Sequence, residues 1–579
     1  MVPLKNTRRR FIALLCGHSL FLPRAWTLGM LQRSSDMAAG KSDTGGDGRP
    51  LDQSSDSGTA AEKLAGITPA DYTYPASPAN VRRYGAALDG RTNDVTALSA
   101  ALAVGGAQSF TIVVDGPMAL ASSVKIPAHV TIEFIMNGAL VVAGGQTVSF
   151  DGIVHASPTY IFQGLGSVAF SVNKQRTFYA EWWGAKGDSV TDDSAALNAA
   201  LAQVSSAQAT LQLVGAYVHK ADLAIPANTE ITGYGKSFGT KLIPTGKAEI
   251  VFNSISIRSA LRRCAIELSA CTGTNGIRFT GGAYNCVVED VFVHGLNKNA
   301  DNTVGIAIGL TLNTVLNRVS VFGSGARIPH TGISVGSGAL GVQLLAPDVE
   351  ACVYGFQVTG TAQCDIITPY IERCSGYSIY LSRNGAGGCM ISGGEIEVAN
   401  STAIGIAIAP NCGNISIYGT TFTLNGGTGI TSHGAGTVSN VSIYGVDAAN
   451  IFDPNNYFYL YGIGGAFTAT LATGGTSAPT VTGSWSRNGK SVTLSLPALA
   501  YTSNGPGMTV SGVPKLAQPI SAQYNYCSVT DSGIATTGEV SSTAGGTLIF
   551  FKGQARIAAS FTNSGIKGFG EFSITYTLE

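Results

Sequence analysis

Residues 332–358 read GISVGSGALGVQLLAPDVEACVYGFQV, and their pattern recurs through the middle of the chain. The stretch opens with a glycine followed by an apolar, a variable and an apolar residue, and the next copy opens at Gly355. A second short apolar segment, residues 349–351, lies between the two glycines. The same pattern begins, at intervals of 21 to 29 residues, at Gly276, Gly305, Gly376 and Gly405, with a weaker copy at Gly429.

This repeat predicts the fold. Short strands, at least two in each repeat and with no helix between them, are typical of a β-solenoid. The spaced leucines and asparagines of leucine-rich repeats are absent, and a β-sandwich requires longer strands joined by hairpins. We therefore predict an all-β chain in which residues 181–465 form the main parallel β-helix. Residues 466–579 contain longer alternating strands, which predict a C-terminal antiparallel β-sandwich.

A second repeat is long-range. The residues of the segment 85–102 recur at 184–201, every match being 99 positions further on. Each copy has a polar turn that ends in a Thr-Asx step and then a short segment with helical spacing. Thr, Asp and Asn near a helix start satisfy its free N–H groups and favour its dipole. We therefore expect a capping helix in each copy, and an N-terminal β-helix-like module over residues 76–180.

Composition excludes several functions. Only 12% of the 579 residues are charged and the formal net charge is zero, so attraction to nucleic acid or to an anionic membrane is not expected. The ten cysteines form no CxxC pair and the seven histidines are scattered, so neither a zinc site nor any other metal or cofactor is predicted. Most thiols should be buried, with few or no disulfides and with Cys352 and Cys374 stacked on neighbouring rungs.

The N-terminus resembles an export signal. An arginine-rich segment, residues 7–11, precedes an apolar run that ends near Leu22, as in twin-arginine signals. The run is too short to span a bilayer comfortably. We interpret residues 1–33 as a signal-like or anchoring segment, with a mis-assigned start as the alternative. Residues 34–75, rich in Ser, Gly and Asp, read as a flexible linker.

Two motifs resemble known proteins. Residues 181–188, EWWGAKGD, followed by TDDSAAL at 191–197, resemble the opening of the pectate-lyase-like superfamily of right-handed β-helices. The Glu-Trp-Trp version looks like bacteriophage and prophage tailspikes, and parts of residues 489–578 are similar to the terminal domain of phage tail proteins. The resemblance implies a homotrimer that binds, and often cuts, a bacterial capsule, O-antigen or exopolysaccharide. It also implies a place on the virion tail or outside the cell, with residues 466–579 used for trimerisation or glycan binding. A signal-like segment stands where a virion-anchoring domain would be expected.

Aligning the second strand of each repeat gives two outward columns. Side chains two positions apart in a strand share a face. The first column reads Glu267, Phe292, Ser320, Glu350, Glu372, Glu397, Thr423. The second column reads Ala265, Asp290, Arg318, Asp348, Tyr370, Glu395, Thr421. Three consecutive rungs should therefore carry an exposed acidic patch made of Asp348, Glu350, Glu372, Glu395 and Glu397.

Such a patch suggests acid–base chemistry. Like charges on neighbouring strands are destabilising, so crowding should raise the pKa of at least one carboxyl group and leave an acid beside an ionised base. Glycoside hydrolysis uses such a pair, about 5–5.5 Å apart for retention and about 6.5–9.5 Å apart for inversion. The open face favours inversion, because it admits water. A solvated acidic stripe without chemistry is the alternative, and a register slip of one residue would turn a carboxylate inward.

Nearby residues suggest substrate contacts. Tyr370, Tyr377 and Tyr380 could stack on sugar rings, and ordinary turn packing is the alternative. Arg373 lies beside the patch, although its side chain should alternate inward or into a turn. A polysaccharide lyase would need a cation, which the acidic patch could hold as calcium, and a Lys or Arg base. Lysine is absent between Lys298 and Lys490, which weakens that alternative.

Three functions are consistent with these residues. The favoured hypothesis is an endo-acting glycosidase that depolymerises bacterial surface polysaccharide. The others are a non-catalytic, tailspike-like adhesin and a polysaccharide lyase. No Ser/His/Asp set, phosphate loop or dinucleotide fingerprint is present to suggest another enzyme class.

Overall fold

The structure is a computed structural model. It describes residues 79–235, 239–273, 275–296, 304–323, 330–383, 388–434, 438–472, 479–503, 505–519, 521–544, 546–552, 561–562 and 565–578. These residues belong to one compact unit, residues 73–579. The predicted signal-like segment and linker lie outside the described residues. No helix among the described residues is long and apolar enough to cross a bilayer.

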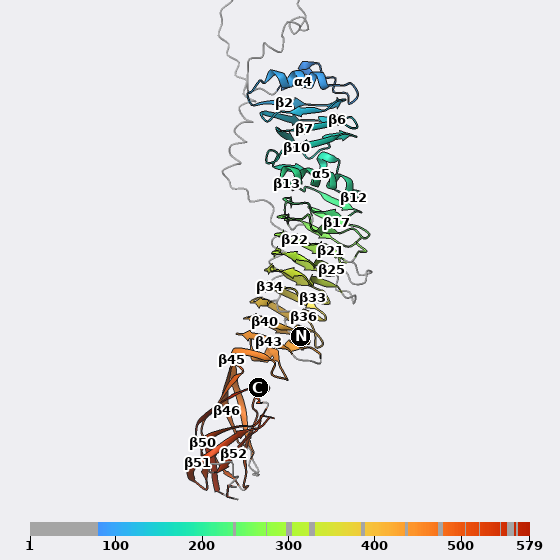
Figure 1. Ribbon diagram of the computed structural model, residues 1–579. Coiled ribbons are helices and arrows are strands. Elements are labelled where there is room, and N and C mark those ends of the chain that lie inside the picture. Colours follow the sequence, from blue (N-terminus) through green and yellow to red (C-terminus); the bar gives the residue numbers. More distant parts are fainter. Residues whose placement is uncertain are drawn as a thin grey trace, which may run out of the picture. The chain divides into compact units, whose positions relative to one another are not determined.

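Residues 177–452 form a right-handed parallel β-helix, which confirms the predicted fold (Figure 1). Its rungs contribute strands to three long parallel sheets. The first sheet contains β11 (Thr177–Tyr179), β13 (Thr210–Gln212), β16 (Glu230–Thr232), β19 (Ala260–Arg262), β23 (Val287–Glu289), β27 (Val315–Asn317), β31 (Val342–Leu345), β34 (Cys364–Ile367), β37 (Cys389–Ser392), β40 (Gly413–Tyr418) and β43 (Ser439–Tyr444).

The other two long sheets follow the same order of rungs. The second sheet contains β12 (Asp188–Asp192), β14 (Ala216–His219), β17 (Lys241–Pro244), β20 (Ala265–Glu267), β24 (Phe292–His294), β28 (Ser320–Phe322), β32 (Asp348–Glu350), β35 (Tyr370–Cys374), β38 (Glu395–Val398) and β41 (Thr421–Leu424). The third sheet contains β15 (Leu223–Ala224), β18 (Ile250–Phe252), β21 (Asn275–Phe279), β25 (Val304–Ile308), β29 (Thr331–Val335), β33 (Tyr354–Gly360), β36 (Tyr377–Arg383), β39 (Ile404–Ile408), β42 (Thr428–Ser432) and β44 (Ile451–Phe452).

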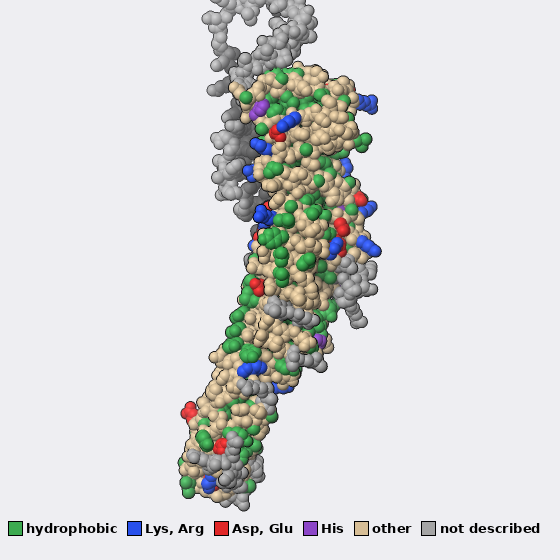
Figure 2. Space-filling model, viewed as in Figure 1, with side chains coloured by type: hydrophobic (Ala, Val, Ile, Leu, Met, Phe, Trp, Pro, Cys, Tyr) green, Lys and Arg blue, Asp and Glu red, His purple; other side chains and the backbone are tan. Residues whose placement is uncertain are grey.

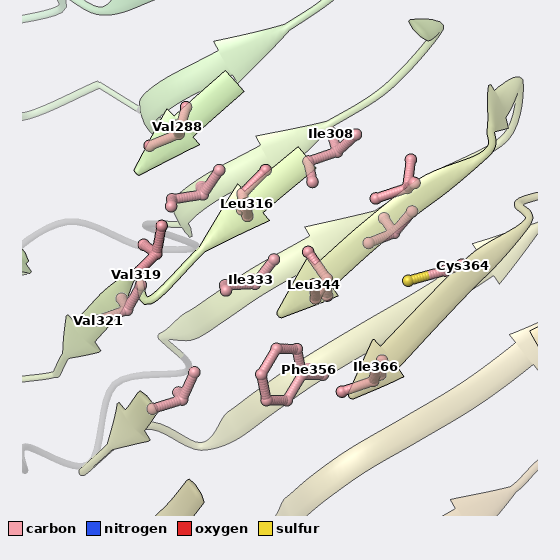
Figure 3. Close-up of a cluster of buried hydrophobic side chains, with 14 of the residues drawn as sticks. Val288, Ile308, Leu316, Val319, Val321, Ile333, Leu344, Phe356, Cys364 and Ile366 are labelled. Atoms are coloured by element: carbon pink, nitrogen blue, oxygen red, sulfur yellow. The ribbon is translucent and has the colours of Figure 1, made fainter. Parts of the chain in front are cut away.

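The core is a stack of apolar side chains inside the coil. Val288, Leu316, Leu344 and Ile366 occupy register positions on successive strands of the first sheet, and each is almost fully buried (Figure 3). Burying an aliphatic side chain contributes about 1.5–3 kcal/mol relative to leaving it exposed. Because every rung repeats this contribution, the interior stabilises the solenoid along its length.

The repeated glycine is required by close packing between sheets. A Cβ atom on Gly332 would lie 2.4 Å from a methyl group of Val349 and 2.7 Å from the carbonyl oxygen of Gly355. The alignment at Gly376 is wrong, because Gly355 on β33 lies beside Ser378 on β36 and Gly376 belongs to the preceding turn. Glycine therefore marks the third-sheet strand in most rungs, and a buried serine replaces it once.

The long-range repeat forms the same structure twice. The carboxylate of Asp89 accepts hydrogen bonds from the N–H groups of Arg91 and Thr92, and Asp188 does the same 99 residues later. These bonds lower the pKa of each aspartate to about 2. The helices α4 (Val95–Val104) and α5 (Ser194–Ala207) follow, as predicted.

The predicted capping role is only partly right. Asp94 and Asp193 occupy the N-cap positions but make no side-chain bond to the helix. Their carboxylates instead accept N–H bonds from the preceding loop, from residues 87–88 and 186–187. The residue before each of them, Asn93 or Asp192, accepts the N–H group of the first helical residue.

Short parallel sheets form the N-terminal module before α5. They contain β1 (Ala79–Asn80), β2 (Phe110–Val114), β3 (Pro117–Leu120), β4 (Val124–Ile126), β5 (Val130–Phe134), β6 (Ala139–Val142), β7 (Thr147–Phe150), β8 (Ile153–Ala156), β9 (Phe162–Gly164) and β10 (Ser167–Phe170). The Glu-Trp-Trp motif lies in a short 3-10 helix, η3 (Ala180–Trp183), whose Trp182 is buried and donates to the carbonyl oxygen of Ser157. Glu181 accepts a 2.5 Å hydrogen bond from Tyr217. The motif is therefore a packing element of this fold.

The C-terminal region is antiparallel, as predicted. Its strands are β45 (Phe458–Ala472), β46 (Thr480–Gly489), β47 (Ser491–Leu496), β48 (Leu499–Ser503), β49 (Met508–Ser511), β50 (Gln523–Asp531), β51 (Ile534–Ser542), β52 (Leu548–Lys552), β53 (Gly565–Phe569) and β54 (Phe572–Thr577). The strand β45 pairs in parallel with β43 of the β-helix and antiparallel with β46. Position 465, where the β-helix was expected to end, therefore lies within the strand β45. The arrangement of the C-terminal strands as a sandwich of two stacked sheets remains a prediction.

The nine described cysteines are buried, and no disulfide joins any of them. Cys352 and Cys374 lie on neighbouring rungs, since Ser375 donates its N–H group to the carbonyl oxygen of Cys352. Burial raises the pKa of Cys374 to about 12. These thiols therefore pack as small apolar groups.

Candidate functional site

The predicted acidic patch lies on the second sheet, on three neighbouring strands. Asp348 pairs in register with Tyr370 and Tyr370 with Glu395, while Glu350 pairs with Glu372. Val349, Ile371 and Ile396, between these residues, are fully buried. The carboxylates of β32, β35 and β38 therefore point outward on rungs about 4.8 Å apart. We call the surface formed by Asp348, Glu350, Glu372, Glu395 and Glu397 the acidic face.

The alignment of the rungs before β32 is wrong. Phe292 pairs with Ala265 and Ser320 pairs with Phe292, so neither residue belongs to the column of Glu350. Asp290 and Arg318 precede their strands, in turns with φ of 52° and 51°. These left-handed turn residues delay the strand start by two positions. The column of Glu350 and Glu372 contains instead Glu267, His294 and Phe322, and a register shift after Ile371 interrupts it before Glu397.

Arg373 corrects a second expectation. Its φ of 56° breaks the strand alternation, and the register shifts between Ile371 and Cys374. The guanidinium consequently lies outside, with about half of its side chain exposed. It forms an ion pair with Glu350, and its Nε lies 3.1 Å from Oε1 of Glu372. The carboxylates of the acidic face are therefore partly compensated by a bulged arginine.

Two further donors fix the carboxylates. The Tyr370 hydroxyl donates to Oε2 of Glu372 over 2.9 Å. The Asn425 amide donates to Oε1 of Glu397 over 3.0 Å. Sequence reasoning missed Asn425, which directly follows β41. Its only sequence signal is that it lies one rung beyond Glu397.

One carboxyl group of the acidic face has a raised pKa. Burial raises the pKa of Glu397, and the charge of Glu372 raises it further. The hydrogen bond from Asn425 and the charge of Arg373 act in the opposite direction. A carboxyl group that tends to hold its proton thus lies next to a carboxylate fixed by two donors. That combination suits general acid–base catalysis.

The tyrosines predicted to bind substrate are divided between two sheets. Tyr370 belongs to the acidic face, whereas Tyr377 and Tyr380 lie on β36 of the third sheet. The rings of Tyr377 and Tyr380 are 5.1 Å apart, and Tyr354 stacks on Tyr377 at 5.5 Å. His433 completes this cluster, because its Nε2 lies 2.9 Å from the Tyr377 hydroxyl. Sequence reasoning missed His433, which is 56 residues away from Tyr377.

Other surface features lie away from the acidic face. A depression on the first sheet is lined by Asp365, Asn414 and Tyr418, among others, and burial raises the pKa of Asp365. A second depression on that sheet is lined by Arg258 and Arg262. Within the described ranges no three His, Cys, Asp or Glu side chains are gathered so as to hold a metal ion.

The fold and this face define a class: a right-handed parallel β-helix protein with a hydrogen-bonded acidic face on one sheet. No protein-family model and no curated protein matches the sequence. Solved structures similar to it include the Acinetobacter phage vB_ApiP_P1 tailspike protein, at 12% identity and a TM-score of 0.37, over 69% of this chain and 87% of that one. The phiAB6 tailspike, crystallised with oligosaccharides of Acinetobacter baumannii surface polysaccharide, is similar at 11% identity and a TM-score of 0.34, over 69% and 86%. The A-module of the Azotobacter vinelandii mannuronan C-5 epimerase AlgE6 is similar at 14% identity and a TM-score of 0.36, over 49% and 89%.

Proposed function

We propose that this chain is a tailspike-like polysaccharide depolymerase, an endo-acting glycosidase that uses Glu397 as its acid and Glu372 as its base or nucleophile. One observation carries the proposal: the raised pKa of Glu397 beside the fixed carboxylate of Glu372. Glu350, Asp348 and Glu395 form the rest of the charged surface. Arg373 and Tyr370 hold Glu372, and both lie where they can contact substrate.

The chemistry follows from these two groups. The Glu397 carboxyl group gives its proton to the glycosidic oxygen as the bond to the anomeric carbon breaks. In inversion, Glu372 takes a proton from a water molecule that attacks the opposite side of that carbon. In retention, Glu372 attacks the carbon directly and water later releases the sugar. Glu372 and Glu397 lie on neighbouring rungs, a separation that suits retention. The inversion favoured by the open face would instead use the alternative pair Glu350–Glu397, two rungs apart.

A lyase is the weaker candidate. It would need an arginine or lysine to remove a proton, and Arg373 is engaged by Glu350 and Glu372. An adhesin remains the second function, because the face shown in Figure 2 bears few charged side chains and could bind a glycan without cutting it. The resemblance of the Glu-Trp-Trp motif supports a homotrimer on a virion tail, or outside the cell.

The test is degradation of purified capsules, O-antigens and exopolysaccharides by the full chain. We expect one of them to be shortened, and Glu372→Gln and Glu397→Gln each to lower the rate by about a hundredfold or more. Glu230→Gln, on the first sheet, is the matched control and should keep full activity. Proton NMR of the first product gives the anomeric configuration. Full activity in both site variants would overturn the site, unsaturated uronate products would establish a lyase, and binding without shortening would establish an adhesin.

A further inference from the structure

Three aromatic rings lie on the second sheet, next to the acidic face. Phe292 and His294 on β24 and Phe322 on β28 point outward, since Val293 and Val321 are fully buried. Phe292 stacks on His294 with ring centroids 4.9 Å apart, and the edge of one phenyl ring meets the face of the other in the pair Phe292–Phe322, also at 4.9 Å. We call this cluster the aromatic platform. All three rings are only partly buried.

The aromatic platform continues the acidic face. Phe322 pairs in register with Glu350, so the two surfaces share an edge between β28 and β32. Glu372 and Glu397 lie two and three rungs beyond Phe322, which places them about 10 Å and about 14 Å away along the sheet. A glycan laid across the rungs would therefore reach both surfaces.

We infer that the aromatic platform is a subsite that stacks an uncharged sugar residue of the glycan whose bond is cut at the acidic face. This inference rests on the proposed function and adds the class of substrate. The C–H faces of a pyranose pack on aromatic rings, and binding sites for small molecules combine such apolar area with a few fixed polar groups. Burial lowers the pKa of His294, so its ring adds no charge at neutral pH.

The surrounding charges select against polyanions. The acidic face has five carboxylates, and the cationic side chain beside them, Arg373, is already paired with Glu350 and Glu372. On the other side of the aromatic platform, Lys241 is neutralised by Glu267 at 2.6 Å. A polyuronate lying across these strands would meet like charges, which oppose association. A neutral chain meets no such barrier.

A sugar fits this surface better than a protein partner does. Stable protein interfaces bury about 800 Å² on each side, with aromatic anchors at their centre. Three rings bounded by two ion-paired clusters form a narrow surface, comparable with one or two sugar residues. Continuity with the acidic face also gives such a sugar a role, because it would place the chain in line with Glu372 and Glu397.

Binding can be tested separately from cleavage. The full chain carrying Glu372→Gln is run by affinity electrophoresis in gels that contain each polysaccharide of the panel, half of them uncharged and half polyanionic. Adding Phe322→Leu or Phe292→Leu keeps the apolar volume and removes the ring. We expect binding of an uncharged polysaccharide to weaken about tenfold. Tyr418→Leu, on the first sheet, is the matched control and should leave binding unchanged.

The outcomes separate this inference from the proposed function. Wild-type cleavage together with unchanged binding of both leucine variants would overturn the aromatic platform and leave the glycosidase standing. Weakened binding without any cleavage by the wild type would support the aromatic platform and overturn the glycosidase. Preferential binding of polyanionic glycans, or retention of no polysaccharide at all, would overturn the inference. Thermal unfolding of each variant shows whether the fold is kept.

Discussion

The interior and the exterior of the same rungs differ in how much their side chains vary from one rung to the next. In the interior, the same register position of successive strands holds a buried aliphatic side chain, namely Val288, Leu316 and Leu344. Outside, the column of the second sheet changes from His294 to Phe322 to Glu350. The interior must fill a constant space at close-packed density, whereas the exterior meets only solvent or ligand. Function can therefore vary on the surface without any change in fold.

The largest effect should come from the interior. Leu344→Ala leaves a cavity in the stack, and we expect the free energy of unfolding to fall by about 2–5 kcal/mol. Gln343→Ala, the outward neighbour on the same strand, should change it by less than about 0.5 kcal/mol. Denaturant unfolding measures both. Equal effects for the two variants would contradict the distinction between the two faces.

Overfilling the interior should have the next largest effect. Gly332→Ala places a methyl group against Val349 and the carbonyl of Gly355, and we expect a loss of about 1–3 kcal/mol in the free energy of unfolding. Gly388→Ala is the control, since a Cβ atom there meets no atom of the described residues within 4 Å. Thermal unfolding compares the two. A Gly332→Ala protein as stable as the wild type would show that the third sheet can move away from Val349 on the second sheet.

On the outside, Arg373→Met should change chemistry more than stability. We expect a cost of at most about 1 kcal/mol, because the ion pairs are partly exposed. Arg373 lowers the pKa of Glu397, so its removal should move the alkaline limb of the activity profile to higher pH. Arg318→Met is the matched control, since Arg318 has a φ of 51° and pairs with Glu289 and Asp290. An unshifted pH profile in Arg373→Met would argue against Glu397 as the acid.

The smallest expected effect is a gain in stability, in the variant Glu397→Gln. The pKa of Glu397 is raised on folding, so its ionised form opposes folding at pH values above the folded pKa, and this penalty disappears below the unfolded value. Glu397→Gln should therefore be slightly more stable than the wild type at pH 7 and no more stable at pH 3. Melting temperatures at the two pH values measure the difference. A lower melting temperature of the variant at pH 7 would contradict the raised pKa.

The sequence predicted the features that depend on repetition. Gly332 and Gly355 identified the third-sheet strands because only glycine fits between sheets there. On the acidic face, the pairings of Asp348 with Tyr370, Tyr370 with Glu395 and Glu350 with Glu372 were predicted correctly, because the buried residues Val349 and Ile371 mark the inward positions.

Features that depend on left-handed backbone residues or on a β-bulge were not predictable from the repeat. Left-handed residues at Asp290 and Arg318 shifted two strands, and the bulge at Arg373 turned a residue expected inside toward the carboxylates. Contacts between distant rungs, such as the hydrogen bond of His433 to Tyr377, leave no local pattern in the sequence.

The strand β45 has a mechanical consequence. Its first residues extend the first sheet of the β-helix, and its later residues pair with β46, so one continuous backbone belongs to both regions. The buried guanidinium of Arg487 on β46 donates to the carbonyl of Leu516 and lies 3.8 Å from the carboxylate of Asp453, which follows the last rung. A pull on the C-terminal strands would therefore load the hydrogen bonds between β43 and β45. Force applied to the C-terminal strands would thus pass into the rungs of the β-helix.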